Sequence, residues 1–252
     1  MKFGKLAPSN DERTLNLANY LNLEILPVPP ENVGYSDSVV VPWGILGNDK
    51  YGDCVLAGAA HETMLWNALG QHNVSFNESC VLSDYSAITG FDPRRPSTDQ
   101  GTNVLDAAKY RQKIGIVDTQ GNRHKVAAYM KIPAGNTNLH RVAVYLFGAV
   151  GIGIEVPKSA QDQFQKHQVW DIPTWFGGRR IIGGHYIPIV GFKKSAPFCV
   201  TWGRIQPMTE AFFKRYNDES YVYLSEEMLV NGKNIVGFDK DQLLADLAAL
   251  RK

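Results

Sequence analysis

The stretch GNDKYGDC, residues 47–54, decides how this chain is interpreted, because a turn-rich loop runs there directly into small and apolar residues. Glycine and Asn-Asp favour tight turns, and the residues that follow predict a helix from Cys54 to Leu69. Cys54 would begin that helix, where free N–H groups and the helix dipole stabilise a thiolate and lower the thiol pKa. Gly52 would let a substrate backbone approach closely. The stretch therefore indicates a nucleophilic cysteine, although an isolated cysteine is more often an ordinary buried residue.

A nucleophilic thiol needs a base, and His185 is the best placed of the six histidines. Two glycines precede it and the apolar run Tyr186–Phe192 follows it, which places the imidazole at the rim of a predicted strand. His61 lies about two turns into the predicted Cys54 helix, and we interpret it as a polar residue of that helix. The others are interpreted as solvated: His72, His124, His140 and His167.

Composition excludes several classes of function. A net charge of +1 gives no electrostatic reason to expect nucleic acid or a membrane surface as partner. The amino-terminal residues lack the apolar stretch of a secretory signal, and no apolar run is long enough to cross a bilayer, so we expect a cytoplasmic protein. Three cysteines do not make a disulfide framework. The sequence contains no metal-ligand spacing and no dinucleotide or phosphate loop, so we expect no metal and no cofactor.

Helical patterns come first along the chain and strand patterns second. This segregation favours an α+β fold with an antiparallel sheet, in a single domain over residues 1–252. We expect a helix-rich half over about 29–145, a sheet-rich half over about 146–225 and a helical extension over 226–252. Predicted helices are Asp11–Leu23, Cys54–Leu69, Ser83–Thr89, Val104–Lys113, Leu139–Phe147 and Asp239–Leu250. Predicted strands are Gly151–Val156, Tyr186–Phe192, Phe198–Trp202 and Tyr221–Leu224.

The order of these features resembles the papain-like cysteine peptidases from about Pro29 to Ser225. The 47–54 loop is similar to that family's active-site loop, in which a Gln six residues before the nucleophile donates to the oxyanion hole. Asn48 holds that position here, and it retains the amide on a shorter side chain. The resemblance implies a papain-like fold, with a helical half that carries Cys54 and a sheet half that carries His185.

Two further segments resemble the family. The stretch around Gly101 is similar to its glycine-containing groove wall, which would bind an extended substrate strand-fashion. Thr201-Trp202-Gly203 resembles the Asn-Ser-Trp-Gly signature, whose Trp shields the contact between the Asn and the catalytic His. Read in register, the Asn that orients the His falls on Val200, which accepts no hydrogen bond; with a one-residue slip it falls on Thr201, whose hydroxyl does. The Asn of the triad is therefore not retained.

These residues leave three functions open. The first is a cysteine peptidase that cleaves peptide or amide bonds through a thioester, with Cys54, His185, Asn48 and Thr201 in the reaction and Gly52, Gly101 and Trp202 against a peptide or protein substrate. The second is a peptidoglycan amidase or endopeptidase with the same chemistry, and the third is an inactive papain-like binding protein. Transfer of the acyl group to an amine also stays open, as does the oligomeric state. Too few residues precede the loop for the family's usual inhibitory propeptide, so we expect none.

Overall fold

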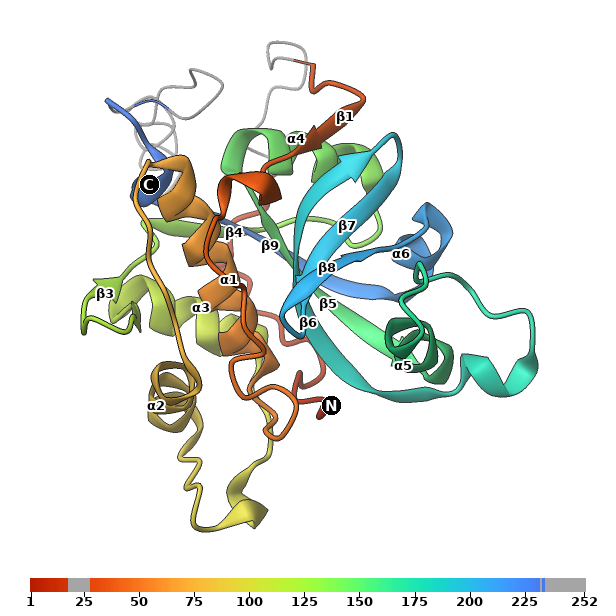
Figure 1. The fold of residues 1–252 in the computed structure, drawn as a ribbon, viewed down its shortest axis with the longest axis horizontal. Coiled ribbons are helices and arrows are strands. Elements are labelled where there is room, and N and C mark those ends of the chain that lie inside the picture. The colour runs from red at the N-terminus through yellow and green to blue at the C-terminus, as the bar shows by residue number, and fades with distance from the viewer. Residues whose placement is uncertain (18–27, 232, 234–252) are drawn as a thin grey trace.

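The computed structural model describes residues 1–17, 28–231 and 233. In Figure 1, helices α1, α2 and α3 lie to one side of a large antiparallel sheet, and the N-terminus lies between α1 and β6. The α-helices are α1 (Cys54–Leu69), α2 (Glu78–Thr89), α3 (Val104–Lys113), α4 (Thr137–Phe147), α5 (Lys158–Gln165) and α6 (Glu210–Tyr216). The strands are β1 (Asn32–Gly34), β2 (Ile116–Val117), β3 (Arg123–His124), β4 (Ala128–Lys131), β5 (Val150–Pro157), β6 (Ile181–Lys193), β7 (Ala196–Thr201), β8 (Arg204–Pro207) and β9 (Asn217–Leu224).

The main sheet has seven strands in the order β4-β9-β5-β6-β7-β8, and β1 pairs with the far end of β6. Its strand pairs are antiparallel. The register of β5 with β6 sets Gly153 opposite Tyr186, and the register of β5 with β9 sets Gly153 opposite Glu219. A row of residues therefore runs across three strands, directly beside His185.

Helix α1 packs against the sheet with almost no exposed surface: of its side chains only Ala68 is more than marginally accessible. It is anchored by a buried ion pair, in which Arg111 of α3 donates to Glu62 of α1 at 2.6 Å. The hydroxyl of Tyr186 on β6 also donates to Glu62, at 2.9 Å. These bonds satisfy a buried carboxylate and fix α1 against α3 and β6.

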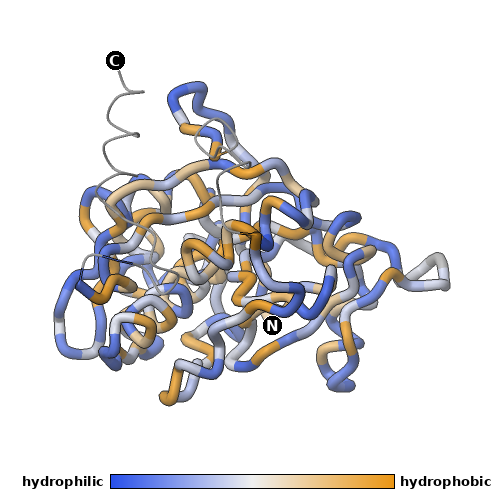
Figure 2. Tube along the Cα trace, turned by 90° about the horizontal axis from the view of Figure 1, so that it is seen from above, coloured by the Kyte–Doolittle hydropathy of each residue, from blue (hydrophilic) through white to orange (hydrophobic). Residues whose placement is uncertain are grey.

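Two clusters of buried apolar side chains fill the interior. One lies between the sheet and α4, α5 and α6, and the other lies between α1, α2, α3 and the opposite face of the sheet. Hydrophilic residues are concentrated in the peripheral loops in Figure 2. Among the described residues, no helix combines the length and the apolar character needed to cross a membrane.

Most predicted elements are confirmed. Helices α1 and α3 have the predicted bounds, while α2 begins at Glu78 and α4 at Thr137, each earlier than predicted. The predicted strands correspond to β5, β6, β7 and β9. The helix predicted for Asp11–Leu23 is wrong over residues 11–17, where a turn at residues 12–13 is followed by a β-bridge between Asn16 and Lys131. The rest of that helix, residues 18–23, lies outside the described residues. The predicted helix Asp239–Leu250 also lies outside them.

Several elements depart from the simple segregation of helices and strands. Helices α5 and α6 lie within the sheet-rich half. Strands β1 and β4 join the main sheet from the helix-rich half, which also contains the two-stranded sheet of β2 and β3. β4 completes the edge beside β9, where Ala128 pairs with Leu224. The helical half carries Cys54 and the antiparallel sheet carries His185, as the predicted α+β fold requires.

Candidate active site

Cys54 is the first residue of α1 and its side chain is buried. A turn at residues 46–50 and a bend at residues 51–52 lead to Asp53, the N-cap residue of α1, whose backbone has φ −95° and ψ 11°. Backbone N–H groups of Tyr186 and Gly4 lie near the sulfur and favour the thiolate. Burial outweighs them and raises the pKa of the Cys54 thiol to about 11. The thiol is therefore protonated at neutral pH in this structure. The lowered pKa that was predicted from its position at the helix N-terminus is wrong here, because the thiol is buried.

His185 lies on β6, where two aromatic side chains contact its ring and one of its ring nitrogens forms a hydrogen bond. Its ring stacks on Trp202, with 4.5 Å between ring centroids, and Phe3 contacts it edge-on. Nε2 lies 2.8 Å from Thr201 Oγ1, which fits an Nε2–H that donates to the hydroxyl. Nδ1 is buried and has no hydrogen-bond partner. Burial, with a smaller contribution from His61, lowers the pKa of His185 to about 3, so the imidazole is neutral.

The predicted pair comes together in the structure. Cys54 and His185 line one small cavity, whose wall also contains Asn48, His61 and Trp202. The bare Nδ1 of a neutral imidazole is the atom that accepts a proton from a thiol, and it is left unpartnered here. The cavity thus contains a thiol and an imidazole, both neutral and both buried.

Asn48 lies beside this cavity and its amide is already engaged. Its Nδ2 lies 3.1 Å from an oxygen of Asp53, 3.3 Å from the Tyr51 carbonyl and 3.5 Å from the Lys2 carbonyl. The Asp53 carboxyl is buried, which raises its pKa to about 8, with the Asn48 hydrogen bond opposing the shift. The amide therefore reaches a peptide carbonyl in the cleft, and its closest partner is Asp53.

The cleft is filled by the chain's own beginning, which we call the N-terminal strap (residues 2–6). Its backbone runs extended between the two halves of the molecule: Lys5 N–H donates to the Gly184 carbonyl at 3.1 Å, and Leu6 N–H donates to the Thr102 carbonyl at 3.1 Å. Thr102 N–H donates in return to the Gly4 carbonyl at 2.8 Å. The strap forms a parallel bridge with Thr102 through Lys5, and the N–H of Gly4 lies at the Cys54 sulfur.

Glycines on both walls make this close approach possible. A Cβ built on Gly101 would overlap the Gly4 carbonyl, and one built on Gly184 would overlap the Lys5 carbonyl. Gly52 also contacts the strap, since a Cβ on Gly4 would overlap the Gly52 carbonyl. Both predicted substrate-binding glycines, Gly52 and Gly101, thus face an extended peptide segment, and the strap that lies on them was not predicted.

The structure corrects the interpretation of three histidines. His61 is buried in the cavity wall, where its Nε2 lies 3.1 Å from the carbonyls of both Trp43 and Gly44. His140 is fully buried against Ser220, and His124 is buried between Asp118 and Glu227. None of them is solvated or merely polar on a helix surface, because each is covered by an element distant in sequence.

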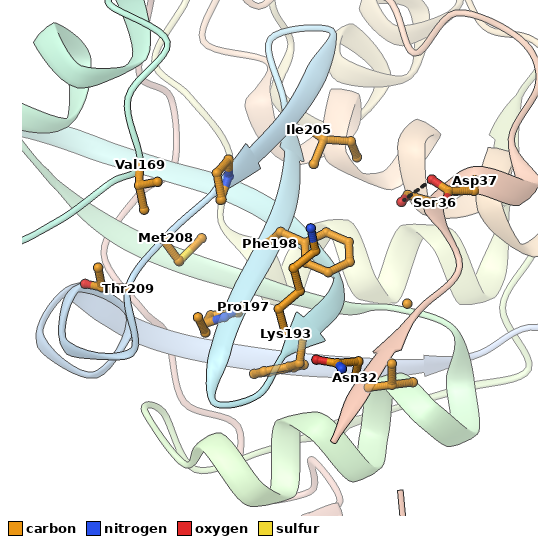
Figure 3. Close-up of a pocket in the computed structure, with 15 residues that line it drawn as sticks. Asn32, Ser36, Asp37, Val169, Lys193, Pro197, Phe198, Ile205, Met208 and Thr209 are labelled. Carbon is orange, nitrogen blue, oxygen red and sulfur yellow. Dashed lines mark hydrogen bonds between the residues drawn. The ribbon is translucent and has the colours of Figure 1, made fainter. Parts of the chain in front are cut away.

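Two other kinds of site, a metal site and a second pocket, can be considered in the described part of the chain. No cluster of three or more His, Cys, Asp or Glu side chains suited to a metal ion occurs among the described residues. A larger hollow lies on the outside of the sheet between β1, β7 and β8, and its walls include Phe198, Ile205 and Met208 (Figure 3). It shares no lining residue with the cavity at Cys54.

Comparisons with known proteins give the class of fold. No family model and no curated protein sequence matches the chain. Among solved structures, it is similar to xylellain, a cysteine protease from Xylella fastidiosa, with a TM-score of 0.68 and 14% identity over 88% of this chain and 96% of that one. It is also similar to proCathepsin B S9 from Trypanosoma congolense, with a TM-score of 0.63 and 12% identity over 89% of this chain and 86% of that one. A third similar structure is digestive procathepsin L2 from Tenebrio molitor larval midgut, with a TM-score of 0.59 and 14% identity over 88% of this chain and 78% of that one. The chain has the papain-like fold.

Proposed function

We propose that the chain is a thiol-dependent peptidase, with Cys54 as nucleophile and His185 as its base. The observation that carries the proposal is the extended peptide segment, the N-terminal strap, held across Cys54 by main-chain hydrogen bonds to both walls of the cleft. Main-chain bonds of this kind recognise a peptide whatever its side chains. The main-chain hydrogen bonds that hold the strap therefore favour a peptide substrate over peptidoglycan.

The proposed reaction begins when a substrate replaces the strap and a proton passes from Cys54 Sγ to His185 Nδ1. The thiolate attacks the peptide carbonyl carbon, and the oxyanion is held by the Cys54 N–H and by Asn48 Nδ2. The imidazolium donates its proton to the leaving amine, which departs as a thioester forms. Water then gives a proton to Nδ1 and attacks the thioester, so that the acid is released and the thiol is restored.

Thr201 has the role of orienting residue in this proposal. Its hydroxyl oxygen lies 2.8 Å from His185 Nε2, and Trp202 covers the ring face. A proton held on Nε2 leaves Nδ1 bare to act as base. The one-residue slip that places Thr201, rather than Val200, at the ring nitrogen is therefore the alignment that the geometry favours.

A second candidate is a catalytically inactive peptide-binding protein. It is favoured by one observation, namely that burial keeps both Cys54 and His185 neutral. The two candidates differ in whether Cys54 and His185 cleave a peptide once it occupies the cleft, as the peptidase would, or only bind it.

The experiment compares casein and purified peptidoglycan as substrates of the full chain with Gly4→Val, because a Cβ at Gly4 overlaps the Gly52 carbonyl and forces the strap out of the cleft. Cys54→Ala and Cys80→Ala are added to that chain as matched variants. We expect casein cleavage and labelling of Cys54 by a thiol-directed epoxide, both absent from Cys54→Ala and both kept in Cys80→Ala, whose cysteine lies on α2. Release of soluble fragments from peptidoglycan alone would favour the amidase. Casein cleavage that persists in Cys54→Ala would exclude the proposed nucleophile.

A further inference from the structure

A buried lysine of the strap fills an acidic pocket beside the proposed nucleophile. Lys5 Nζ lies 2.7 Å from an oxygen of Asp218 and 3.0 Å from an oxygen of Glu219, and its side chain is 1% exposed. Both carboxylates lie at the start of β9. The Lys5 backbone is held on the cleft wall by Gly184, the residue before His185. The pocket is thus a lateral branch of the cleft itself.

The pocket has more negative charge than one lysine neutralises. Glu219 is 4% exposed, and neither of its oxygens accepts a hydrogen bond of good geometry; the second oxygen of Asp218 is likewise without one. Burial raises the pKa of Glu219, and the charge of Lys5 opposes this. The Asp218 side chain is 23% exposed, so the buried member of the pair is Glu219. With the strap displaced, neither carboxylate would have a cation from the described residues in contact, which is costly for the buried Glu219.

The pocket has room for a long side chain because of a glycine. A Cβ built on Gly153 of β5 would overlap Cε of Lys5 and would press on Asp218. Gly153 pairs with Glu219 on one side and with Tyr186, next to His185, on the other. Its missing side chain opens a channel from the cleft to the two carboxylates, wide enough for an aliphatic stem that ends in a cationic group.

We infer that the pocket formed by Gly153, Asp218 and Glu219 selects a lysine or arginine side chain of the substrate, within two residues of the bond that Cys54 attacks. The inference rests on the proposed function, since it names the substrate of the same cleft. The position follows from the strap, in which the N–H of Gly4 faces the Cys54 sulfur and the next residue enters the pocket. An arginine would bind both carboxylates through its fork of donors.

The kinetic test uses the full chain with Lys5→Ala, which vacates the pocket. Substrates are N-blocked dipeptidyl coumarylamides with arginine, leucine or glutamate at each of the two positions. We expect arginine at one position to raise kcat/KM by about 100-fold over leucine, as charge-assisted bonds to buried carboxylates allow. Adding Asp218→Asn with Glu219→Gln should reduce that preference to a few-fold. Glu155→Gln, an exposed carboxylate of β5, is the matched control and should leave the preference intact.

A binding test keeps the inference falsifiable without turnover. In the chain with Lys5→Ala and Cys54→Ala, a fluorescent peptide with the sequence of residues 2–6 should bind at least about 10-fold more tightly than the same peptide with leucine in place of its second lysine. Gly153→Ala should remove the difference by filling the channel, even where the carboxylate variants fold poorly.

The outcomes separate the two proposals. Hydrolysis with no basic preference, or with one that survives the Asp218 and Glu219 substitutions, would overturn the pocket assignment and leave the peptidase standing. Selective binding of the lysine peptide with no hydrolysis of any substrate would support the pocket and contradict the peptidase. Equal binding of the two peptides would overturn the assignment whatever the kinetics show.

Discussion

Displacing the strap should convert Cys54 from an inert thiol into a reactive one. The substitution Gly4→Val does this without changing the side chain of Cys54 or His185, because any Cβ at Gly4 overlaps the Gly52 carbonyl and forces the strap off that wall. Water then reaches the sulfur and the N-terminus of α1. The thiolate is no longer penalised by burial, which is the largest cause of its raised pKa.

The expected magnitude follows from the pKa. Burial raises the pKa of Cys54 from 9.0 to about 11, so at pH 8 the thiolate fraction in the closed state is about 100-fold below that of an unperturbed thiol. Because the thiolate is the species that reacts, Gly4→Val should accelerate alkylation of Cys54 by at least ~100-fold at pH 8. The alkylation rate of the parent chain should still be rising steeply at pH 10, whereas that of the variant should reach half of its maximum at or below about pH 9.

The assay is timed alkylation with iodoacetamide, followed by mass spectrometry of the peptide that contains Cys54. Cys199 is an internal control, because it is fully buried on β7, remote from the strap, and its pKa is raised by burial. Leu6→Ala is the matched variant, since that side chain is 45% exposed while its backbone holds the strap. Equal alkylation rates for Cys54 in the parent and Gly4→Val chains would refute the reasoning that the strap keeps the thiol neutral.

Three further predictions follow from individual contacts. Thr201→Val should lower kcat by roughly 10- to 100-fold with little change in KM, because a buried Nε2–H loses its acceptor, whereas Thr201→Ser should restore activity; equal kinetics for all three chains would exclude an orienting role. Glu62→Gln should lower the free energy of unfolding by about 3–5 kcal/mol in urea titrations, since it leaves the Arg111 guanidinium buried without a counter-charge. The pKa of His124 is raised because its ion pairs with Glu227 and Asp118 outweigh burial, so their stabilisation is full below about pH 6.5 and is lost as pH rises through the folded pKa. His124→Gln should therefore destabilise the protein more at pH 5 than at pH 9, and the reverse order would contradict the ion pairs.

The sequence predicted well those features that depend on neighbouring residues. The turn before Cys54 and the small residues after it define α1 to the residue, and the apolar run after His185 defines most of β6. The chemistry of the pair was readable because a thiol at a helix start and an imidazole after two glycines are local patterns. Gly101 was also predicted from a local pattern, namely the short segment around it that resembles the family's groove wall.

Features that depend on distant residues were not predictable in the same way. The strap has no periodic pattern, and its Lys5 donates a hydrogen bond to Asp218, which lies 213 residues away in the sequence. The local argument for a lowered pKa failed because Cys54 is buried, and burial raises the pKa of its thiol more than the nearby backbone N–H groups lower it. Whether Val200 or Thr201 faces the His185 ring depends on the register of β7 against β6, which includes a bulge. His61 lies on the predicted helix, as interpreted, but its burial and its contact with the Trp43 carbonyl were not readable from the helix pattern.

The central claim is that Cys54 and His185 cleave peptides through a thioester, and trapping the intermediate tests it most directly. The Gly4→Val chain would be mixed with a peptide ester substrate, quenched in acid during turnover and analysed by peptide mass spectrometry. We predict an acyl adduct on Cys54 that disappears on further incubation before quenching, that forms much more slowly in His185→Ala, and that is absent from Cys54→Ala. Substrate turnover with no adduct on Cys54, undiminished in the Cys54→Ala chain, would contradict the account.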